Sequence, residues 1–309
     1  MEELIEQILL RLPPEEPAYL VRAALVCKAW RNMLSDSSRG GFLRRYREFH
    51  GTPPMLGYLL HNNRRPHFVA TTSTASPPLS MPEASDLDIS WGLVLDCRHG
   101  RVLIIDDFYS GPNTKLVVWD PITRYMKHLV VPGHQPYSCI GAVLCAIDRC
   151  DHLDCRGGPF RVVLVKMEIF HEEVPNDDDL VDAWATVYSS ETDAWSAASS
   201  SILARCPIDA VPSLLIGDEL YFTSFGRGTP DMLKYDLGSH GLSMIDTQGV
   251  PCGAVAMKAH DGGLGFVAMW GNRLYLMSRQ ATGGWGTAQD YRAQDDIAPR
   301  KPASTVWLR

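Results

Sequence analysis

The feature of the sequence that most constrains its fold is a strand–turn–strand pattern that recurs after residue 115. In each copy a strand ends in a bulky residue, a short polar turn follows, and the next strand carries another bulky residue. The copies cover residues 117–129, 185–197, 232–245 and 274–287. Their anchors, Trp119, Tyr188, Tyr235 and Met277, are 69, 47 and 42 residues apart. The last two intervals match the ~40–50-residue period of a β-propeller blade, and each hairpin must stack on a neighbour to bury its apolar face.

The repeat predicts four blade-like units between residues 91 and 292. Hydrophobic runs there alternate with Gly, Asp, Asn and Pro, and we expect no long helix among them. Strands near 55–60 and 67–71 would supply part of a fifth unit. A propeller must close to remove its edge strands. Two possibilities follow: the early strands and the C-terminal tail share the closure, or the chain lacks part of a larger ring.

The first fifty residues show the period of helices instead. Leu4, Ile5, Ile8, Leu9 and Leu12 form one apolar helical face, which Pro13 and Pro14 end. We expect a second helix from Ala18 to Leu34 and a third over 42–49. The sequence therefore predicts an α+β multidomain chain. It has a helical module at 1–50, a linker with early strands at 51–90, and an all-β, propeller-like domain at 91–309, which is incomplete if the ring lacks a blade.

Composition excludes several classes of function. The chain has 309 residues and a formal net charge of −7, so nucleic acid is not an expected partner. The one basic cluster, Arg39, Arg44, Arg45 and Arg47, is interpreted as the solvated face of an amphipathic helix. No run approaches the ~20 apolar residues of a membrane span, and the acidic N-terminus is no secretory signal. Eight cysteines are then expected to be free thiols, in the cytosol or nucleus.

A cysteine-rich segment in the β region raises the possibility of a zinc site. Cys139, Cys145, Cys150, His152 and Cys155 are ligand types for zinc. Their cysteine spacings lack the tight Cys-x2-Cys knuckle that pre-forms half of a tetrahedral site. Cys139 and Cys145 lie in an apolar run and are predicted to be core residues. We therefore expect no metal site and no cofactor.

Other motifs give weaker signals. In the acidic segment 171–182, Pro175 stands where a zinc protease has its second His. Asp177, Asp178 and Asp179 could bind a hard cation weakly, but a solvated loop is favoured. Gly262 and Gly263 predict a hairpin turn rather than a phosphate loop. No Gly-x-Ser-x-Gly elbow and no grouped catalytic set is present, so we expect no enzyme, with a propeller-fold enzyme as an alternative.

The N-terminal residues resemble a known family. An apolar helix ending in Arg-Leu-Pro, then Leu-Val-Arg, then Val-Cys-Lys-Ala-Trp-Arg, is similar to the F-box, a short helical module. The segments VVWDPITRYMKHL and VYSSETDAWSA resemble the blades of the F-box-associated, kelch-like β domains of plant F-box proteins. The whole chain is similar to a grass-type plant F-box protein.

This resemblance implies a substrate-recognition subunit of a Skp–cullin–F-box ubiquitin ligase. The helices would bind a Skp-family adaptor, and through it a cullin, while the β domain would bind a target protein. Carried over by position, the adaptor-binding candidates are Leu4, Ile5, Ile8, Leu9, Leu12, Pro13, Leu20, Val21, Val26, Cys27 and Trp30. Trp30 could face either the adaptor or the core of the module.

The chain departs from the family pattern at its start. The module usually opens with a Leu-Pro pair before the first helix, whereas Glu2 and Glu3 directly precede Leu4 here. We expect either weaker adaptor binding or an N-terminally incomplete chain. A stand-alone β-propeller binding protein with a degenerate F-box is therefore the main alternative function.

Overall fold

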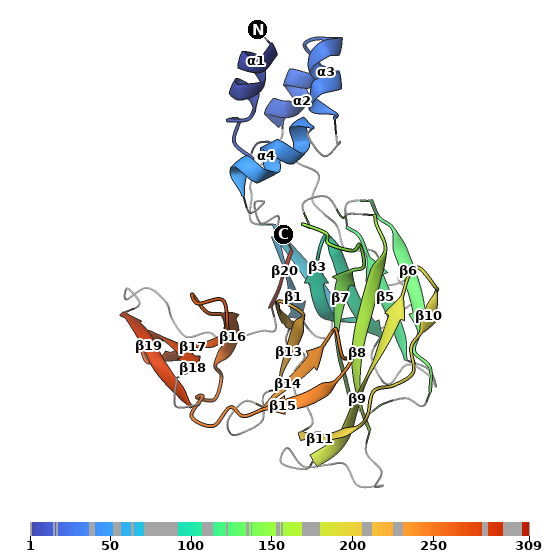
Figure 1. Cartoon of the computed structure of the whole chain (residues 1–309), viewed down its shortest axis with the longest axis vertical. Helices are drawn as coiled ribbons and strands as arrows, with labels where there is room; N and C mark the ends of the chain where they lie inside the picture. The colour runs from blue at the N-terminus through green and yellow to red at the C-terminus, as the bar shows by residue number, and fades with distance from the viewer. Residues whose placement is uncertain are drawn as a thin grey trace.

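The structure is a computed structural model that places helices at one end of the chain and β-sheets in the rest (Figure 1). It describes residues 2–14, 16, 18–36, 41–51, 57–62, 65–70, 92–106, 114–121, 123–133, 136, 138–152, 155, 157–168, 180–205, 212–224, 231–279, 284–292 and 305–308.

The N-terminal module contains four helices rather than the expected three. These are α1 (Glu2–Leu9), α2 (Ala18–Ala24), α3 (Lys28–Leu34) and α4 (Phe42–His50). The prediction of one helix from Ala18 to Leu34 was wrong, because Cys27 is extended at φ −158° and ψ 167°. Its Sγ accepts the Trp30 N–H at 3.5 Å, so Cys27 acts as the N-cap of a new helix.

The helices share a small core of their own. Its buried members are Leu9, Leu10, Ala23, Leu34, Phe42 and Tyr46. Two side chains of α4 also reach the end of α1. The Tyr46 hydroxyl donates to the Leu12 carbonyl at 2.7 Å, and His50 Nε2 lies 2.8 Å from the Leu10 carbonyl. Both carbonyls lie just after α1, where the helix no longer supplies a backbone partner.

The β region contains the four predicted blade-like units, each an antiparallel sheet whose strands follow chain order. The first sheet is β3 (Gly92–Arg98), β4 (Arg101–Asp106), β5 (Lys115–Trp119) and β6 (Met126–Val130). The second is β7 (Ser138–Cys145), β8 (Phe160–Glu168), β9 (Leu180–Ser189) and β10 (Ala194–Trp195), with β11 (Ile202–Arg205) also on β9. The third is β12 (Leu214–Ile216), β13 (Glu219–Ser224), β14 (Asp231–Asp236) and β15 (Leu242–Ile245). The fourth is β16 (Val255–Lys258), β17 (Leu264–Trp270), β18 (Arg273–Arg279) and β19 (Trp285–Arg292).

The early strands form a further sheet with the last strand of the chain. β1 (Gly57–Asn62) pairs with β2 (Arg65–Ala70) on one side and with β20 (Thr305–Leu308) on the other. The sequence analysis gave two possibilities for closing the propeller. This pairing matches the first, in which the early strands and the C-terminal tail lie in one sheet. The architecture of a helical module followed by an all-β, propeller-like region of sequential four-stranded sheets is therefore confirmed.

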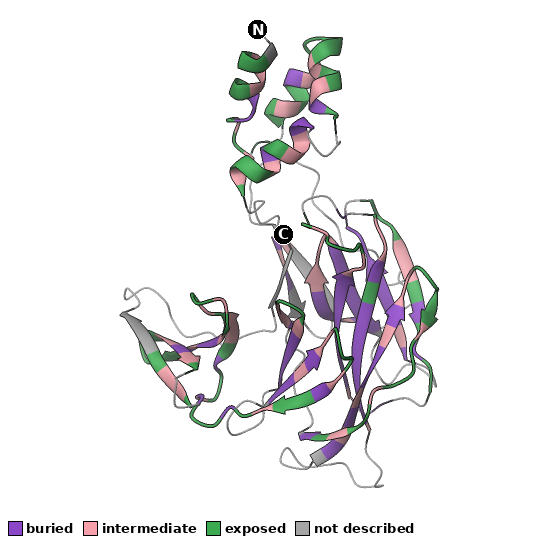
Figure 2. Cartoon of the chain, in the orientation of Figure 1, coloured by how far each residue is buried: buried purple, intermediate pink, exposed green. Residues whose placement is uncertain are grey.

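Burial is concentrated in the first two large sheets (Figure 2). Every residue of β5 after Lys115 is buried, as are six consecutive residues of β7, Cys139–Leu144. In the fourth sheet only Gly265, Phe266 and Ala268 of β17 and Met277 of β18 are buried among the residues whose side chains are described. The main core of the molecule thus lies between the β3–β6 and β7–β11 sheets and reaches the third sheet through β11 and β14.

The sequence repeat corresponds to one position in the four sheets. Trp119, Tyr188, Tyr235 and Met277 all lie on the third strand of their sheet, and all are buried. In three copies the residue five positions later has a left-handed φ: 60° at Arg124, 51° at Asp193 and 56° at His240. Tyr188 donates its hydroxyl to Asp193 at 2.5 Å, and the Tyr235 hydroxyl lies 2.8 Å from His240 Nδ1. In the second and third sheets the anchor therefore also bonds to the turn that follows it.

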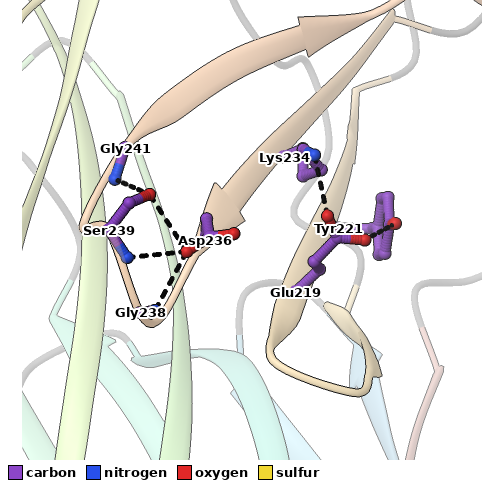
Figure 3. A network of polar contacts seen from close by, with 7 residues as sticks. All are labelled: Glu219, Tyr221, Lys234, Asp236, Gly238, Ser239 and Gly241. Atoms are coloured by element: carbon purple, nitrogen blue, oxygen red, sulfur yellow. Dashed lines mark hydrogen bonds and ion pairs between the residues drawn. The ribbon is translucent and has the colours of Figure 1, made fainter.

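The third sheet shows how such a turn is held (Figure 3). Asp236 Oδ1 accepts the N–H of Gly238 at 3.0 Å and both the N–H and the hydroxyl of Ser239, at 2.7 and 3.0 Å. These bonds, led by those from Ser239, hold the pKa of Asp236 below its ordinary value. On the neighbouring strand pair, Glu219 accepts a hydrogen bond from Lys234 at 2.8 Å.

A second repeated contact links neighbouring sheets. The bulky residue of the fourth strand is Trp195 in the second sheet and Trp285 in the fourth. Trp195 Nε1 donates to the Val130 carbonyl of β6 at 3.0 Å, and Trp285 Nε1 donates to the Asp246 carbonyl, directly after β15, at 2.8 Å. Each indole therefore bonds to the end of the preceding sheet.

We predict that Trp195→Phe lowers the free energy of unfolding by about 1 kcal/mol, because it keeps an aromatic ring but removes this hydrogen bond. Urea denaturation of the full chain measures the change. Trp270→Phe is the control, since Trp270 is 76% exposed and a surface change should stay within about 0.5 kcal/mol. Equal stability of the two variants would contradict a role for the indole N–H.

A buried ion pair joins three sheets. Asp96 on β3 is 1% exposed, and its Oδ2 accepts the Val143 N–H of β7 at 3.0 Å. Arg98 Nε lies 3.3 Å from the same oxygen, and Arg98 also donates to the carbonyl and hydroxyl of Ser213, just before β12. Burial raises the pKa of Asp96 to about 6, against the opposing effects of Arg98 and the Val143 N–H.

This shift predicts a pH-dependent effect of Asp96→Asn, which keeps an oxygen acceptor but cannot ionise. As the pH rises from about 4 to 6, the unfolded wild-type chain releases the Asp96 proton before the folded chain does, so wild type loses stability there. The variant lacks this loss. We expect its stability relative to wild type to rise by on the order of 3 kcal/mol between pH 4 and 7, measured by urea denaturation. A difference that does not vary with pH would show that the Asp96 pKa is ordinary.

Candidate functional site

The helical module exposes a set of large apolar side chains. Leu4 and Ile8 lie one turn apart on α1, so they share a face of that helix. Val21 on α2, with Leu25 and Val26 in the turn that follows, forms a second exposed group. Leu25 is the most exposed, at 79%. Exposed apolar groups that gather on a small domain mark surfaces that bind another protein.

The predicted adaptor-binding residues divide between this surface and the core of the module. Six are exposed: Leu4, Ile8, Pro13, Val21, Val26 and Cys27. Four are half-buried: Ile5, Leu12, Leu20 and Trp30. Leu9 is buried. Trp30 packs against the core cluster of the module, so its ring is at least partly structural. Their contacts with an adaptor stay a prediction.

Sequence reasoning missed Leu25 as a candidate for binding. It falls within the single helix that the sequence predicted from Ala18 to Leu34. The helix instead ends at Ala24, and the turn at Leu25 and Val26 points both residues to solvent. The signal for this break was Cys27, whose short side chain can cap a helix.

The basic cluster of the module is used in ion pairs within the chain. Arg44 pairs with Glu48 on the same helix at 3.0 Å and with Asp151 in the connection between β7 and β8. Arg45 pairs with Glu6 of α1. Arg39 lies outside the described residues. The paired arginines agree better with an internal structural role than with a polyanion site.

The other predicted motifs lie in ordinary structure or outside the described residues. Gly262, at φ 87°, and Gly263 form the turn between β16 and β17, as predicted. The acidic residues 171–179, including Asp177, Asp178 and Asp179, lie outside the described part of the chain. Cys139 is buried in the core, as predicted. The described helices have at most nine residues, and none is long and apolar enough to cross a membrane.

The prediction for Cys145 was wrong. Its side chain is only half-buried and belongs to the Cys3His cluster, which we define as Cys145, Cys150, His152 and Cys155. Burial raises the pKa of the Cys155 thiol to about 12, and the neighbouring Cys145 thiol adds to the effect. His99, against the ring of His152, has a pKa lowered to about 4 by burial and by the charges of His152, Arg98 and Arg101.

Comparison with known proteins identifies the helical module. Residues 2–39 match the family model described as F-box-like. This match covers α1 to α3 and the exposed apolar groups described above. Among proteins of curated function, none matches the chain.

Solved structures with related folds are distant. TolB from Acinetobacter baumannii is 13% identical, with 82% of this chain and 54% of that chain covered and a TM-score of 0.35. The Dos1 propeller is 9% identical, with 60% and 44% covered and a TM-score of 0.35. The β-propeller domain of the trilobed protease from Pyrococcus furiosus is 11% identical, with 62% and 51% covered and a TM-score of 0.28. The chain spans about half the length of these structures, and at these scores the fold assignment rests on its own strand order.

We predict that neighbouring residues of α1 differ sharply when truncated. Leu9→Ala should destabilise the module by about 2–5 kcal/mol, because it leaves a cavity in the small core. Ile8→Ala, at an exposed position, should change stability by less than about 0.5 kcal/mol. Hydrogen exchange of peptides from residues 2–50 in the full chain measures the opening of the module directly. Similar effects of the two changes would contradict the assignment of faces.

Proposed function

We propose that this chain is the substrate-recognition subunit of a Skp–cullin–F-box ubiquitin ligase. The observation that carries the proposal is the F-box-like match over residues 2–39, on helices that leave Leu4, Ile8, Val21, Leu25 and Val26 exposed. In this function the helices bind a Skp-family adaptor, and the β region binds a target protein.

The chemistry of the exposed groups supports a protein partner. Five large aliphatic side chains in a module of about fifty residues can bury enough apolar area to contribute several kcal/mol to binding, at about 1.5–3 kcal/mol for each fully buried side chain. Arg44 and Arg45, two of the basic residues that could attract a polyanion, are instead engaged with Glu6, Glu48 and Asp151. A helical apolar surface suits a helical or grooved protein partner.

In the mechanism that we propose, this chain brings a target close to the enzyme and catalyses no reaction itself. Holding a target beside a ubiquitin-loaded enzyme converts a bimolecular encounter into an effectively intramolecular one. The chain needs no catalytic residue for this role. The target would contact loops that connect strands of the propeller-like region, because such loops vary without disturbing the sheets.

The proposal also covers the type of the β region, the link to a cullin and the place of the protein in the cell. The β region would be of the kelch-like, F-box-associated type found in plant F-box proteins, given the resemblance of residues 117–129 and 187–197 to those blades. The adaptor would connect the chain to a cullin. Work in such a ligase would place the protein in the cytoplasm, the nucleus or both.

The test is binding of the purified full chain to a purified Skp-family adaptor, measured by calorimetry. Ile8→Asp and Val21→Asp should each weaken binding at least tenfold, because a charge would be buried at the interface. Trp270→Asp, at an exposed apolar position of the fourth sheet, should bind like wild type. Circular dichroism of each variant confirms folding.

Failure of the folded wild-type chain to bind would refute the ligase role. The chain would then be a stand-alone β-propeller binding protein with a degenerate F-box. Leu12 and Trp30 are poorer test positions, because both pack against the core of the module and their loss would mix unfolding with loss of binding.

A further inference from the structure

The connection between β7 and β8 brings together four side chains whose sequence spacing lacks a Cys-x2-Cys knuckle. The Cys3His cluster comprises the thiols of Cys145, Cys150 and Cys155 and a ring nitrogen of His152. These ligand atoms all lie within 4.8 Å of one another. Cys145 is the last residue of β7, and the other three follow within ten positions.

We propose that the Cys3His cluster is a structural zinc site. Three thiolates and one imidazole are a common donor set for closed, tetrahedral Zn²⁺. Bond lengths of about 2.3 Å to sulfur and 2.1 Å to nitrogen place the ligand atoms of such a site about 3.8 Å apart for two sulfurs and about 3.6 Å for sulfur and nitrogen. His152 Nδ1 already lies 3.9 Å from Cys155 Sγ. Small side-chain rotations would bring the remaining atoms to these distances.

The backbone of the connection is arranged around the sulfurs. The His152 N–H donates to Cys150 Sγ at 3.4 Å, and the Ile147 N–H donates to Cys145 Sγ. Both bonds run from residue i+2 back to the cysteine, so each holds its sulfur in place. Arg149 and His152 have left-handed φ values of 50° and 58°, which cost energy in residues other than glycine. A metal bound by the turn would offset that cost.

A buried cation beside the cluster supplies an independent observation. Arg101 is 4% exposed, and its Nη2 donates to the Gly158 carbonyl and, at 3.5 Å, to the Cys155 carbonyl. Its Nη1 is buried without a hydrogen-bond partner among the described residues. A buried guanidinium is costly unless a negative charge lies near it. Zn²⁺ with three thiolates and a neutral imidazole carries a net charge of −1, which would provide that counter-charge.

The site would fix a junction between the two parts of the chain. Asp151, between Cys150 and His152, pairs with Arg44 of α4. The ring of His152 lies against that of His99 in the turn between β3 and β4, with centroids 4.1 Å apart. Metal bound at the cluster would hold Asp151 and the His152 ring in place, and so would orient the helical module on the first two sheets.

The first experiment measures metal in the full-length chain, purified under reducing conditions without chelator. We expect one zinc per chain by elemental analysis. Replacement by Co²⁺ should give the visible absorption of tetrahedral cobalt and a sulfur-to-cobalt charge-transfer band. Cys150→Ser should lose at least nine-tenths of the bound metal, whereas His152→Cys should keep it with a stronger charge-transfer band. Cys139→Ala and Cys252→Ser are the controls and should keep one equivalent.

The second experiment removes the metal from the wild-type chain and does not depend on any variant folding. Apo protein prepared with a chelator should melt at a lower temperature, and Zn²⁺ alone should restore the transition. Hydrogen exchange in α4 and in residues 145–160 should increase on metal removal and reverse on addition. Folded, reduced wild type that binds no zinc or cobalt would overturn the proposal, as would one equivalent retained in a Cys150→Ser, His152→Ala double variant.

Discussion

The arrangement of the first three large sheets depends on one buried carboxylate. Asp96 lies at a bulge in β3, where an extra residue changes the register with β4 and turns the side chain towards β7. There it accepts the Val143 N–H and pairs with Arg98, which also donates to Ser213. Apolar contacts fill the space between sheets but tolerate sliding. A directional bond between them fixes their register, so this pair defines how the apolar faces meet.

The sequence predicted the repeated parts of this fold well and its singular parts poorly. Trp119, Tyr188, Tyr235 and Met277 could be aligned because each is a buried anchor on the third strand of its sheet. The break at Cys27 occurs once, and helical periodicity does not detect it, since Val21 and Leu25 before it and Trp30 and Leu34 after it each keep a four-residue spacing. The pairing of β1 with β20 could not be predicted for the same reason, because pairing between segments distant in the sequence leaves no local sequence pattern.

The functional surfaces divide in the same way. Helical spacing identified the apolar residues of α1 and α2, but only the packing of four helices separates Ile8, which faces solvent, from Leu9, which does not. The sequence identified the residues of the Cys3His cluster as zinc-ligand types, but no metal site was expected because their cysteine-to-cysteine spacings lack the Cys-x2-Cys knuckle. His152 and Cys155, with two residues between them, would take the place of the missing Cys-x2-Cys knuckle in the proposed site. Arg101 gave no signal in the sequence, because its significance is its burial.

The pairing of β1 with β20 has a consequence for the order of events during synthesis. Gly57 pairs with Leu308, 251 positions later. At roughly 5–20 residues per second, the edge of β1 that β20 will cover has to wait about 13–50 s for its partner to leave the ribosome. During that interval the strand presents unpaired N–H and C=O groups, a template for pairing with another chain. β20 therefore completes this sheet long after β1 is made, and until then a chaperone would have to cover the open edge of β1.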